Sequence, residues 1–435
     1  MPEEITGPVE TLTLFGKTVR EYLIKFDKTG KCLSIQSQAD LIAHIHNDHI
    51  TDVIFYIHGW NNDYPTAKTR YEEFLAGVSS MAERQPGHLP SGFTLVFVGV
   101  IWPSTAFVWP SEAAPDIAAT GDDEAFDDVL SLLADGDAEH LRASLRDRAA
   151  LDAGDFARFA TALAANLPPP DASEPDANPV AAEDAIAVWG ELARVKGNPK
   201  SDGGFGGFGG ATMPVSPNEP LSAGGLFFDP RILLRAATVM QMKDRAGVVG
   251  AAGAANMLGQ LLNTKARVHL VGHSYGAKVV STALVHQTSG KKAQSMLLLQ
   301  PAVNHLAFAP NARDGQPGAF HEAFDRLQRP LLATYSFHDF PLHAIFHLIL
   351  RRKADLGELQ AAAEGISRYA ALGGYGPQEY LSEKVILHDL PQVGVKLPNA
   401  ANSVRMIGLN GKIGIGGHSD VNNDYIYWTF LTQLG

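Results

Sequence analysis

Residues 267–276 read RVHLVGHSYG. The run 267–271 is short and apolar, as a buried parallel strand is, and it ends in a Gly-x-Ser-x-Gly pentapeptide before a helical pattern over 277–284. Strand, sharp turn and helix in this order predict a turn that exposes the Ser274 hydroxyl, with Gly272 and Gly276 where strand and helix approach most closely. We therefore expect Ser274 to be a nucleophile. The alternative is a serine that only caps the helix.

The chain on both sides of this stretch alternates between strand and helix patterns. This alternation predicts an α/β protein with a mostly parallel, doubly wound sheet. Strands are expected at Thr11–Phe15, Arg20–Phe26, Asp52–Ile57, Thr94–Ile101, Ser295–Gln300, Leu331–Phe337 and Val404–Leu409, and helices near Ala39–His46, Thr66–Ala82, Pro230–Asn263 and Val421–Leu434.

Residues 111–230 interrupt this pattern. They are rich in Ala, Asp, Pro and Gly, they include Pro168–Pro170 and the repeat Gly203–Gly210, and helical patches occur near 125–133, 139–151 and 182–195. We expect a helical and Gly-rich insertion, partly mobile, between a first part of the core (1–110) and a second part (231–435). It would be a lid, a partner-binding module or a surface excursion.

Two further elements accompany the pentapeptide. The expected strand 52–57 is followed by His-Gly-Trp-Asn-Asn at His58–Asn62, and the expected strand 94–101 is followed by Trp-Pro-Ser at Trp102–Ser104. With the pentapeptide, these elements resemble the α/β-hydrolase superfamily over about 52–110 and 235–435, and more loosely a bacterial branch of uncharacterised hydrolases. The resemblance implies the α/β-hydrolase fold and a serine hydrolase with esterase- or lipase-like activity.

The chain order of nucleophile, acid and histidine in that superfamily selects partners for Ser274. His418, in a loop before the last helix, is the expected base, with His388 as the alternative. Asp339 follows the expected strand 331–337 and is the expected acid, with Asp389 and Asp420 as competitors. The resemblance gives the triad to Ser274, Asp339 and His418.

A tetrahedral intermediate also needs backbone N–H donors for its oxyanion. The amides of Tyr275 and Trp60 are the expected donors, and the resemblance implies the same two residues. His58, Asn61 and Trp102 are further expectations for substrate binding. His58 is more readily a brace for this loop than a proton carrier.

Composition excludes several other functions. The net charge of −12 argues against nucleic-acid binding, and the single cysteine, Cys32, gives neither a disulfide framework nor a Cys-based zinc site. His343 and His347 have the i, i+4 spacing of a metal pair without further ligand signals, so we expect neither metal nor cofactor. No signal peptide is evident, and the Ala- and Gly-rich stretch 248–262 is expected to be a buried helix rather than a membrane span. A cytoplasmic location follows by default, with non-classical secretion open.

The expected reaction is hydrolysis of a small-molecule or lipid carboxylic ester through an acyl-enzyme on Ser274. Amidase, thioesterase and peptidase activities use the same constellation of residues. A binding protein that kept the fold and lost the chemistry is the alternative from another class.

Overall fold

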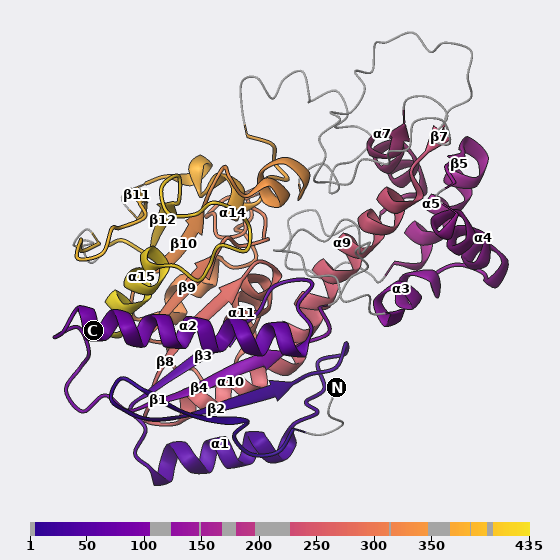
Figure 1. Cartoon of the computed structure of the whole chain (residues 1–435). Coiled ribbons are helices and arrows are strands. Elements are labelled where there is room, and N and C mark those ends of the chain that lie inside the picture. Colours follow the sequence, from indigo (N-terminus) through magenta and orange to yellow (C-terminus); the bar gives the residue numbers. More distant parts are fainter. Residues whose placement is uncertain are drawn as a thin grey trace.

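The computed structural model describes residues 5–104, 123–147, 149–167, 180–195, 227–312, 315–346, 366–382, 384–397 and 403–435. In this part of the chain, nine strands form one central sheet in the order β1-β2-β4-β3-β8-β9-β10-β12-β11 (Figure 1). All neighbours are parallel except the hairpin of β1 and β2. The strands are β1 (Glu10–Leu14), β2 (Lys17–Lys25), β3 (Asp52–Ile57), β4 (Leu95–Ile101), β8 (Arg267–His273), β9 (Ser295–Leu299), β10 (Leu331–Tyr335), β11 (Val385–Asp389) and β12 (Met406–Asn410).

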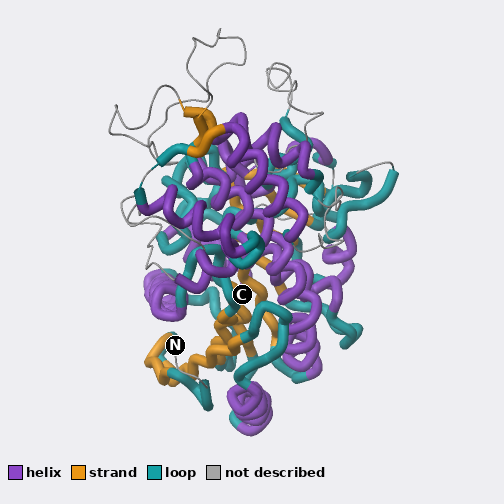
Figure 2. The backbone as a smooth tube through the Cα atoms, turned by 90° about the vertical axis from the view of Figure 1, so that its right-hand side faces the viewer, coloured by secondary structure: helices purple, strands orange, loops and turns teal. Residues whose placement is uncertain are grey.

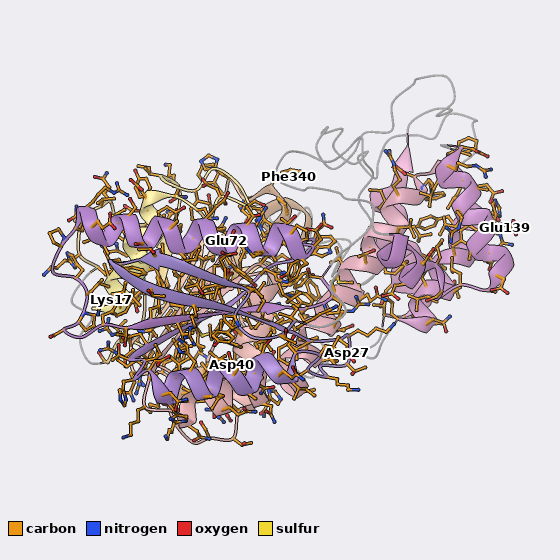
Figure 3. The ribbon with its side chains drawn as sticks, turned by 60° about the horizontal axis from the view of Figure 1, so that its bottom comes forward. Lys17, Asp27, Asp40, Glu72, Glu139 and Phe340 are labelled. Atoms are coloured by element: carbon orange, nitrogen blue, oxygen red, sulfur yellow. The ribbon has the colours of Figure 1, made fainter. Side chains whose placement is uncertain are left out.

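Helices cover both faces of this sheet because its central strands are apolar on both sides. Phe55 and Ile57 of β3 belong to one apolar cluster, together with residues of α1, α10 and α11. Ile54 and Tyr56 belong to the opposite cluster, with residues of α2 and α15. In Figure 3, the helix labelled at Glu72 (α2) and the helix labelled at Asp40 (α1) lie on opposite sides of the sheet. The helices are α1 (Ile35–Asn47), α2 (Tyr64–Arg84), α10 (Ala255–Asn263), α11 (Tyr275–His286) and α15 (Asp424–Leu434).

The expected class, an α/β protein with a large and mostly parallel sheet flanked by helices, is therefore confirmed. Several strand ends differ from the expectation by one to three residues. β9 ends at Leu299, because Gln300 has a φ of 38°, and β10 ends at Tyr335, two residues early. β11, where the sequence was compatible with strand or loop, is an edge strand parallel to β12. Short elements complete this half: η4 (His321–Arg326), η5 (Pro341–Ile345), α14 (Leu372–Tyr375) and η7 (Gln378–Tyr380).

The long helix expected over 230–263 is not regular throughout. It consists of α9 (Pro230–Val248), the π-helical turn η3 (Val249–Ala254) and α10. Two glycines let η3 approach its neighbours closely. A Cβ at Gly250 would lie 2.7 Å from Thr282 Cβ, and one at Gly253 would overlap the carbonyl oxygen of Gly30. The irregular turn thus lies where the helix packs most tightly against the core.

A second body, the helical lobe (described residues between 123 and 239), projects from one end of the sheet (Figure 1). It has its own apolar cluster, in which Phe156, Phe159 and Trp189 are almost fully buried. Figure 2 shows its helices packed together in front of the sheet when the molecule is turned. Its elements are α3 (Asp123–Leu130), α4 (Asp135–Arg146), α5 (Ala153–Asn166), α6 (Ala182–Asp184), η2 (Ala185–Trp189), α7 (Gly190–Ala193) and a small antiparallel sheet of β5 (Leu151–Asp152), β7 (Phe227–Phe228) and β6 (Arg194–Val195).

The lobe is joined to the core by α9. The first half of α9 packs in the lobe cluster, and Met242 and Ala246 of its second half pack in the core cluster. Trp60 and Met240 are partly buried and contact both clusters. The lobe occupies the stretch expected as an insertion, whose Pro168–Pro170 and Gly203–Gly210 tracts lie outside the described residues.

Within the described part of the chain, no helix is both long enough and apolar enough to cross a membrane. The stretch 248–262, expected to be a buried helix, forms η3 and most of α10.

Candidate active site

Ser274 lies in the sharp turn between β8 and α11. Its backbone has φ 54° and ψ −124°, a conformation that residues with a side chain rarely adopt. Ser274 N donates to Leu299 O of β9 (3.1 Å), and Ser274 O accepts from Ala302 N (3.1 Å). The strained turn is therefore held from the neighbouring strand and from the chain that follows it.

Two glycines allow the surrounding chain to come close to Ser274. A Cβ at Gly276 would overlap the carbonyl oxygen of Ile57, at the end of β3. A Cβ at Gly59 would lie 2.7 Å from Ser274 Cβ. The loop after β3 can thus lie directly against the serine only because position 59 has no side chain.

His418 joins Ser274 to Asp339. His418 Nε2 lies 2.9 Å from Ser274 Oγ, and His418 Nδ1 lies 2.7 Å from Asp339 Oδ2. With its proton on Nδ1, the imidazole donates to the carboxylate and accepts from the hydroxyl. Asp339 is fully buried, Ser274 is 2% exposed, and the His418 side chain is 21% exposed. The imidazole of His418 is thus within hydrogen-bond distance of both other side chains that are expected to act with it.

The competing residues do not contact His418 through their side chains. His388 Nδ1 donates to Asp389 O (2.6 Å) at the end of the edge strand β11. The Asp420 carboxylate accepts from Gly416 N (2.8 Å) and from Asn423 Nδ2 (2.9 Å), so it shapes the loop that carries His418. Neither Asp389 nor Asp420 replaces Asp339 as the partner of the imidazole.

The loop His58–Asn62 is folded around the side chain of Asn62. Asn62 Nδ2 donates to Gly59 O (3.1 Å) and to Trp60 O (2.9 Å). Asn61 has φ 57°, and its backbone N–H donates to Ser104 O (2.7 Å). Because a trans peptide directs its N–H opposite to its C=O, the bond from Asn62 to Gly59 O turns the Trp60 N–H away from Asn62.

The side chains of His58 and Trp102 support the backbone of this loop. His58 Nδ1 donates to Gly59 O (2.9 Å), Trp102 Nε1 donates to His58 O (3.0 Å), and the two rings stack with centroids 5.9 Å apart. Burial lowers the pKa of His58 to about 4, although its bond to the Gly59 carbonyl opposes the shift. Both side chains are nearly inaccessible, at 3% and 2% exposure, so their direct contacts are with the protein itself.

Tyr275 begins α11 directly after the serine. Its hydroxyl donates to Val239 O of α9 (3.2 Å), and its ring meets Trp60 edge-on with centroids 6.2 Å apart. Trp60 Nε1 is buried and has no hydrogen-bond partner among the described residues. Aromatic side chains of the nucleophile turn and of the loop after β3 thus lie next to the helix that leads into the lobe.

Two residues that the sequence did not single out contact the main chain at His418. Gln300 Nε2 donates to His418 O (2.9 Å), and so does His273 Nε2 (2.9 Å). His273 is the variable residue before the serine in the pentapeptide, which gives no signal of its own. Gln300 follows β9, and only its unusual backbone brings it to the site.

No group of three or more potential metal ligands occurs among the described residues. His343 stacks on Tyr375, with ring centroids 4.3 Å apart, and its Nδ1 lies 3.2 Å from Gly374 O. His347, the other member of the expected pair, lies outside the described residues.

Neither a protein-family model, nor a curated protein, nor a solved structure matches this chain.

Proposed function

We propose that this protein is a serine hydrolase of the α/β-hydrolase type that cleaves carboxylic esters. The observation that carries the proposal is the chain of contacts from Ser274 Oγ to His418 Nε2 (2.9 Å) and from His418 Nδ1 to buried Asp339 (2.7 Å), with the serine on a strained turn between strand and helix. This geometry is that of a nucleophile, a base and a group that orients the base.

The reaction begins when His418 accepts the hydroxyl proton as Ser274 Oγ attacks the ester carbonyl carbon. The tetrahedral intermediate collapses, the bond to the alcohol oxygen breaks, and His418 gives its proton to the leaving alcohol. Water then attacks the acyl-enzyme with His418 as base, the carboxylic acid leaves, and the proton returns to Ser274. Asp339 stays ionised and supports the imidazolium in both halves of the reaction.

The backbone amides of Trp60 and Tyr275 are the proposed donors to the oxyanion. Tyr275 is the first residue of α11, so its amide lies at the positive end of a helix dipole. The Trp60 N–H belongs to the peptide whose carbonyl is turned toward Asn62, and Gly59 brings that peptide against the serine. His58 and Trp102 act in this proposal by bracing the loop.

Apolar groups near the triad favour a substrate with an apolar part. Trp60 meets Tyr275, the residue after the serine, edge-on. Phe337 and Phe340, which precede and follow Asp339 in the chain, are 49% and 46% exposed (Phe340 is labelled in Figure 3). Exposed aromatic side chains at a site contribute apolar contact area. We therefore propose esters with apolar acyl or alcohol groups ahead of amides and peptides.

A fluorophosphonate probe tests the nucleophile. The wild-type protein is expected to be labelled at Ser274, identified by peptide mass spectrometry, and Ser274→Ala to remain unlabelled and to lose p-nitrophenyl ester turnover by at least about 10³-fold. A panel of short and long acyl esters, thioesters and amides then defines the substrate class. A well-folded wild-type protein that takes no label would instead favour a binding protein with this fold.

A further inference from the structure

The main-chain carbonyl of His418 is held from two directions. Gln300 Nε2 donates to it at 2.9 Å, and the same amide group donates to Gly417 O at 2.8 Å. His273 Nε2 is the other donor, at 2.9 Å. His273 is the last residue of β8, directly before Ser274, and Gln300 directly follows the last residue of the neighbouring strand β9.

Gln300 reaches this carbonyl from a constrained position. It is fully buried, its φ is 38°, and its backbone N–H donates to Thr334 Oγ1 of β10 (2.9 Å). Gly373 packs against it so closely that a Cβ at Gly373 would overlap the Gln300 carbonyl carbon. A backbone in this region is unfavourable for glutamine and persists only when its surroundings impose it.

His418 needs such an anchor because it lies on neither a helix nor a strand. It belongs to a loop between β12 and α15 that includes Gly414, Gly416 and Gly417. Glycine gives the unfolded loop more conformations than other residues do, so the loop sequence alone does little to fix the imidazole. The ring must nevertheless stay in reach of Ser274 and Asp339 whether or not it carries the extra proton.

We propose that Gln300 is a positioning residue for His418: its side-chain amide fixes the main chain at residues 417 and 418, and thereby the imidazole, relative to the nucleophile. This inference rests on the proposed function. Gln300 does not touch the reacting atoms, and its effect on the reaction passes through His418.

An amide suits this position better than a carboxylate does. Both of its protons are used, one on each carbonyl, whereas an ionised glutamate would set a negative charge against two carbonyl oxygens. His273 is also uncharged, because burial holds its pKa well below its usual range. Neither donor therefore adds a charge beside the imidazolium that forms during catalysis.

The test compares Gln300→Met, which keeps the side-chain volume and removes both donors, with Ser336→Ala. Ser336 Oγ donates to Ile415 O (3.2 Å) in the same loop and accepts from His338 N (3.1 Å), and it bonds neither to His418 nor to Gln300, so it is the matched control. Gln300→Met is expected to lower kcat for p-nitrophenyl butyrate by about 10- to 100-fold and to leave KM within about twofold. Ser336→Ala is expected to keep kcat within about threefold of the wild type.

A second readout separates positioning from general loss of structure. The proton between His418 Nδ1 and Asp339 is expected as a low-field resonance in the wild type and in Ser336→Ala, and to be broadened by exchange in Gln300→Met. Gln300→Glu, of the same size, gives a second variant if Gln300→Met does not fold, with an equal or larger loss of kcat.

The outcomes separate the two proposals. Unchanged kcat in a folded Gln300 variant, or a loss confined to KM, overturns the positioning role while the labelled and active wild type keeps the proposed function. An equal loss of kcat in Ser336→Ala also overturns it, because the effect would then come from any weakened contact of the loop and not from the bonds of Gln300 to residues 417 and 418. A wild type that fluorophosphonate does not label overturns both.

Discussion

Asp339 has a partner for each of its carboxylate oxygens. Oδ2 lies 2.7 Å from His418 Nδ1, and Oδ1 accepts from Leu342 N (3.0 Å). The second bond fixes the plane of the carboxylate, and the first fixes which imidazole nitrogen carries the proton. The residue can therefore orient the base without taking its proton.

Asp339→Asn is expected to lower kcat by roughly 10⁴-fold with a small change in KM, because an amide no longer selects the imidazole tautomer that accepts from Ser274. Steady-state kinetics with a p-nitrophenyl ester that the wild type hydrolyses measure this. The control is Asp389→Asn, at the exposed end of β11, which should keep wild-type kcat. Equal effects of the two substitutions would contradict the assignment of Asp339.

Glu21 is a buried carboxyl group outside the site. It lies on β2 with no exposed surface, and neither carboxyl oxygen has a hydrogen-bond partner among the described residues. Burial, together with the nearby carboxylates of Glu72 and Glu10, raises its pKa from 4.5 to about 7, and Lys68 opposes the shift. The folded state therefore binds this proton more tightly than the unfolded state does.

The sign of the effect on stability follows from that difference. Well below pH 4.5 the group is protonated in both states and has no effect. Between pH 4.5 and about 7 the free energy of unfolding falls as the pH rises, because the unfolded state releases this proton while the folded state retains it. Above pH 7 the loss reaches about 3 kcal/mol. Glu21→Gln is expected to remove this slope, so that urea unfolding at pH 8 shows a gain over the wild type that shrinks toward pH 5. Parallel pH profiles of the two proteins would refute this.

At the level of elements, the sequence predicts best where burial is complete. β3 and β4 lie inside the sheet, and apart from Asp52 each is a continuous apolar run that can be recognised without its neighbours. β8 is also buried but contains Arg267 and His269, and the pentapeptide that follows identifies it. β11 is an edge strand with half-exposed residues and a polar end, and its sequence suits a loop equally well. The presence of the central strands was therefore predictable, although several of their ends were not, and the edge strand β11 was not predictable.

The candidate site divides in the same way. Ser274 is marked by a local pattern of strand, turn and helix, and Asp339 and His418 follow from chain order in the superfamily that the sequence resembles. Gln300 has no such mark, because its side chain reaches a loop 117 residues further along the chain from a backbone conformation that no local pattern indicates.

The helical run 230–263 supplies an element-scale prediction from two of its glycines. Gly253→Ala in η3 would force a Cβ into the carbonyl of Gly30 and is expected to destabilise the fold by about 1–3 kcal/mol. Gly259→Ala in α10 meets nothing within 4 Å and is expected to stabilise it by about 0.5–1 kcal/mol, because alanine favours helix. Thermal or urea unfolding of the two variants measures the difference. If both behave alike, the π-helical turn is not held by close packing.

At the scale of the whole molecule, α9 fixes the position of the lobe relative to the core. The Tyr275 hydroxyl donates a hydrogen bond to Val239 O of this helix. Arg245, also in α9, donates to Pro103 O of the core (3.1 Å) and forms an ion pair with Asp128 of the lobe (3.0 Å). Trp60 contacts the apolar clusters of both bodies. The lobe therefore cannot move as a unit without bending α9 or breaking contacts beside the nucleophile.

The hydrogen bonds of the triad also bear on how the chain acquires its native state. They join residues 79 and 144 positions apart, so two long loops must close before nucleophile, base and acid meet. Helices form from neighbouring residues within microseconds, whereas a sheet built from such distant segments is slow to assemble. During refolding, a chain can regain most of its helix while its serine still lacks a base. If the proposed hydrolysis is observed, its recovery, rather than recovery of helical signal, therefore reports that the topology is native.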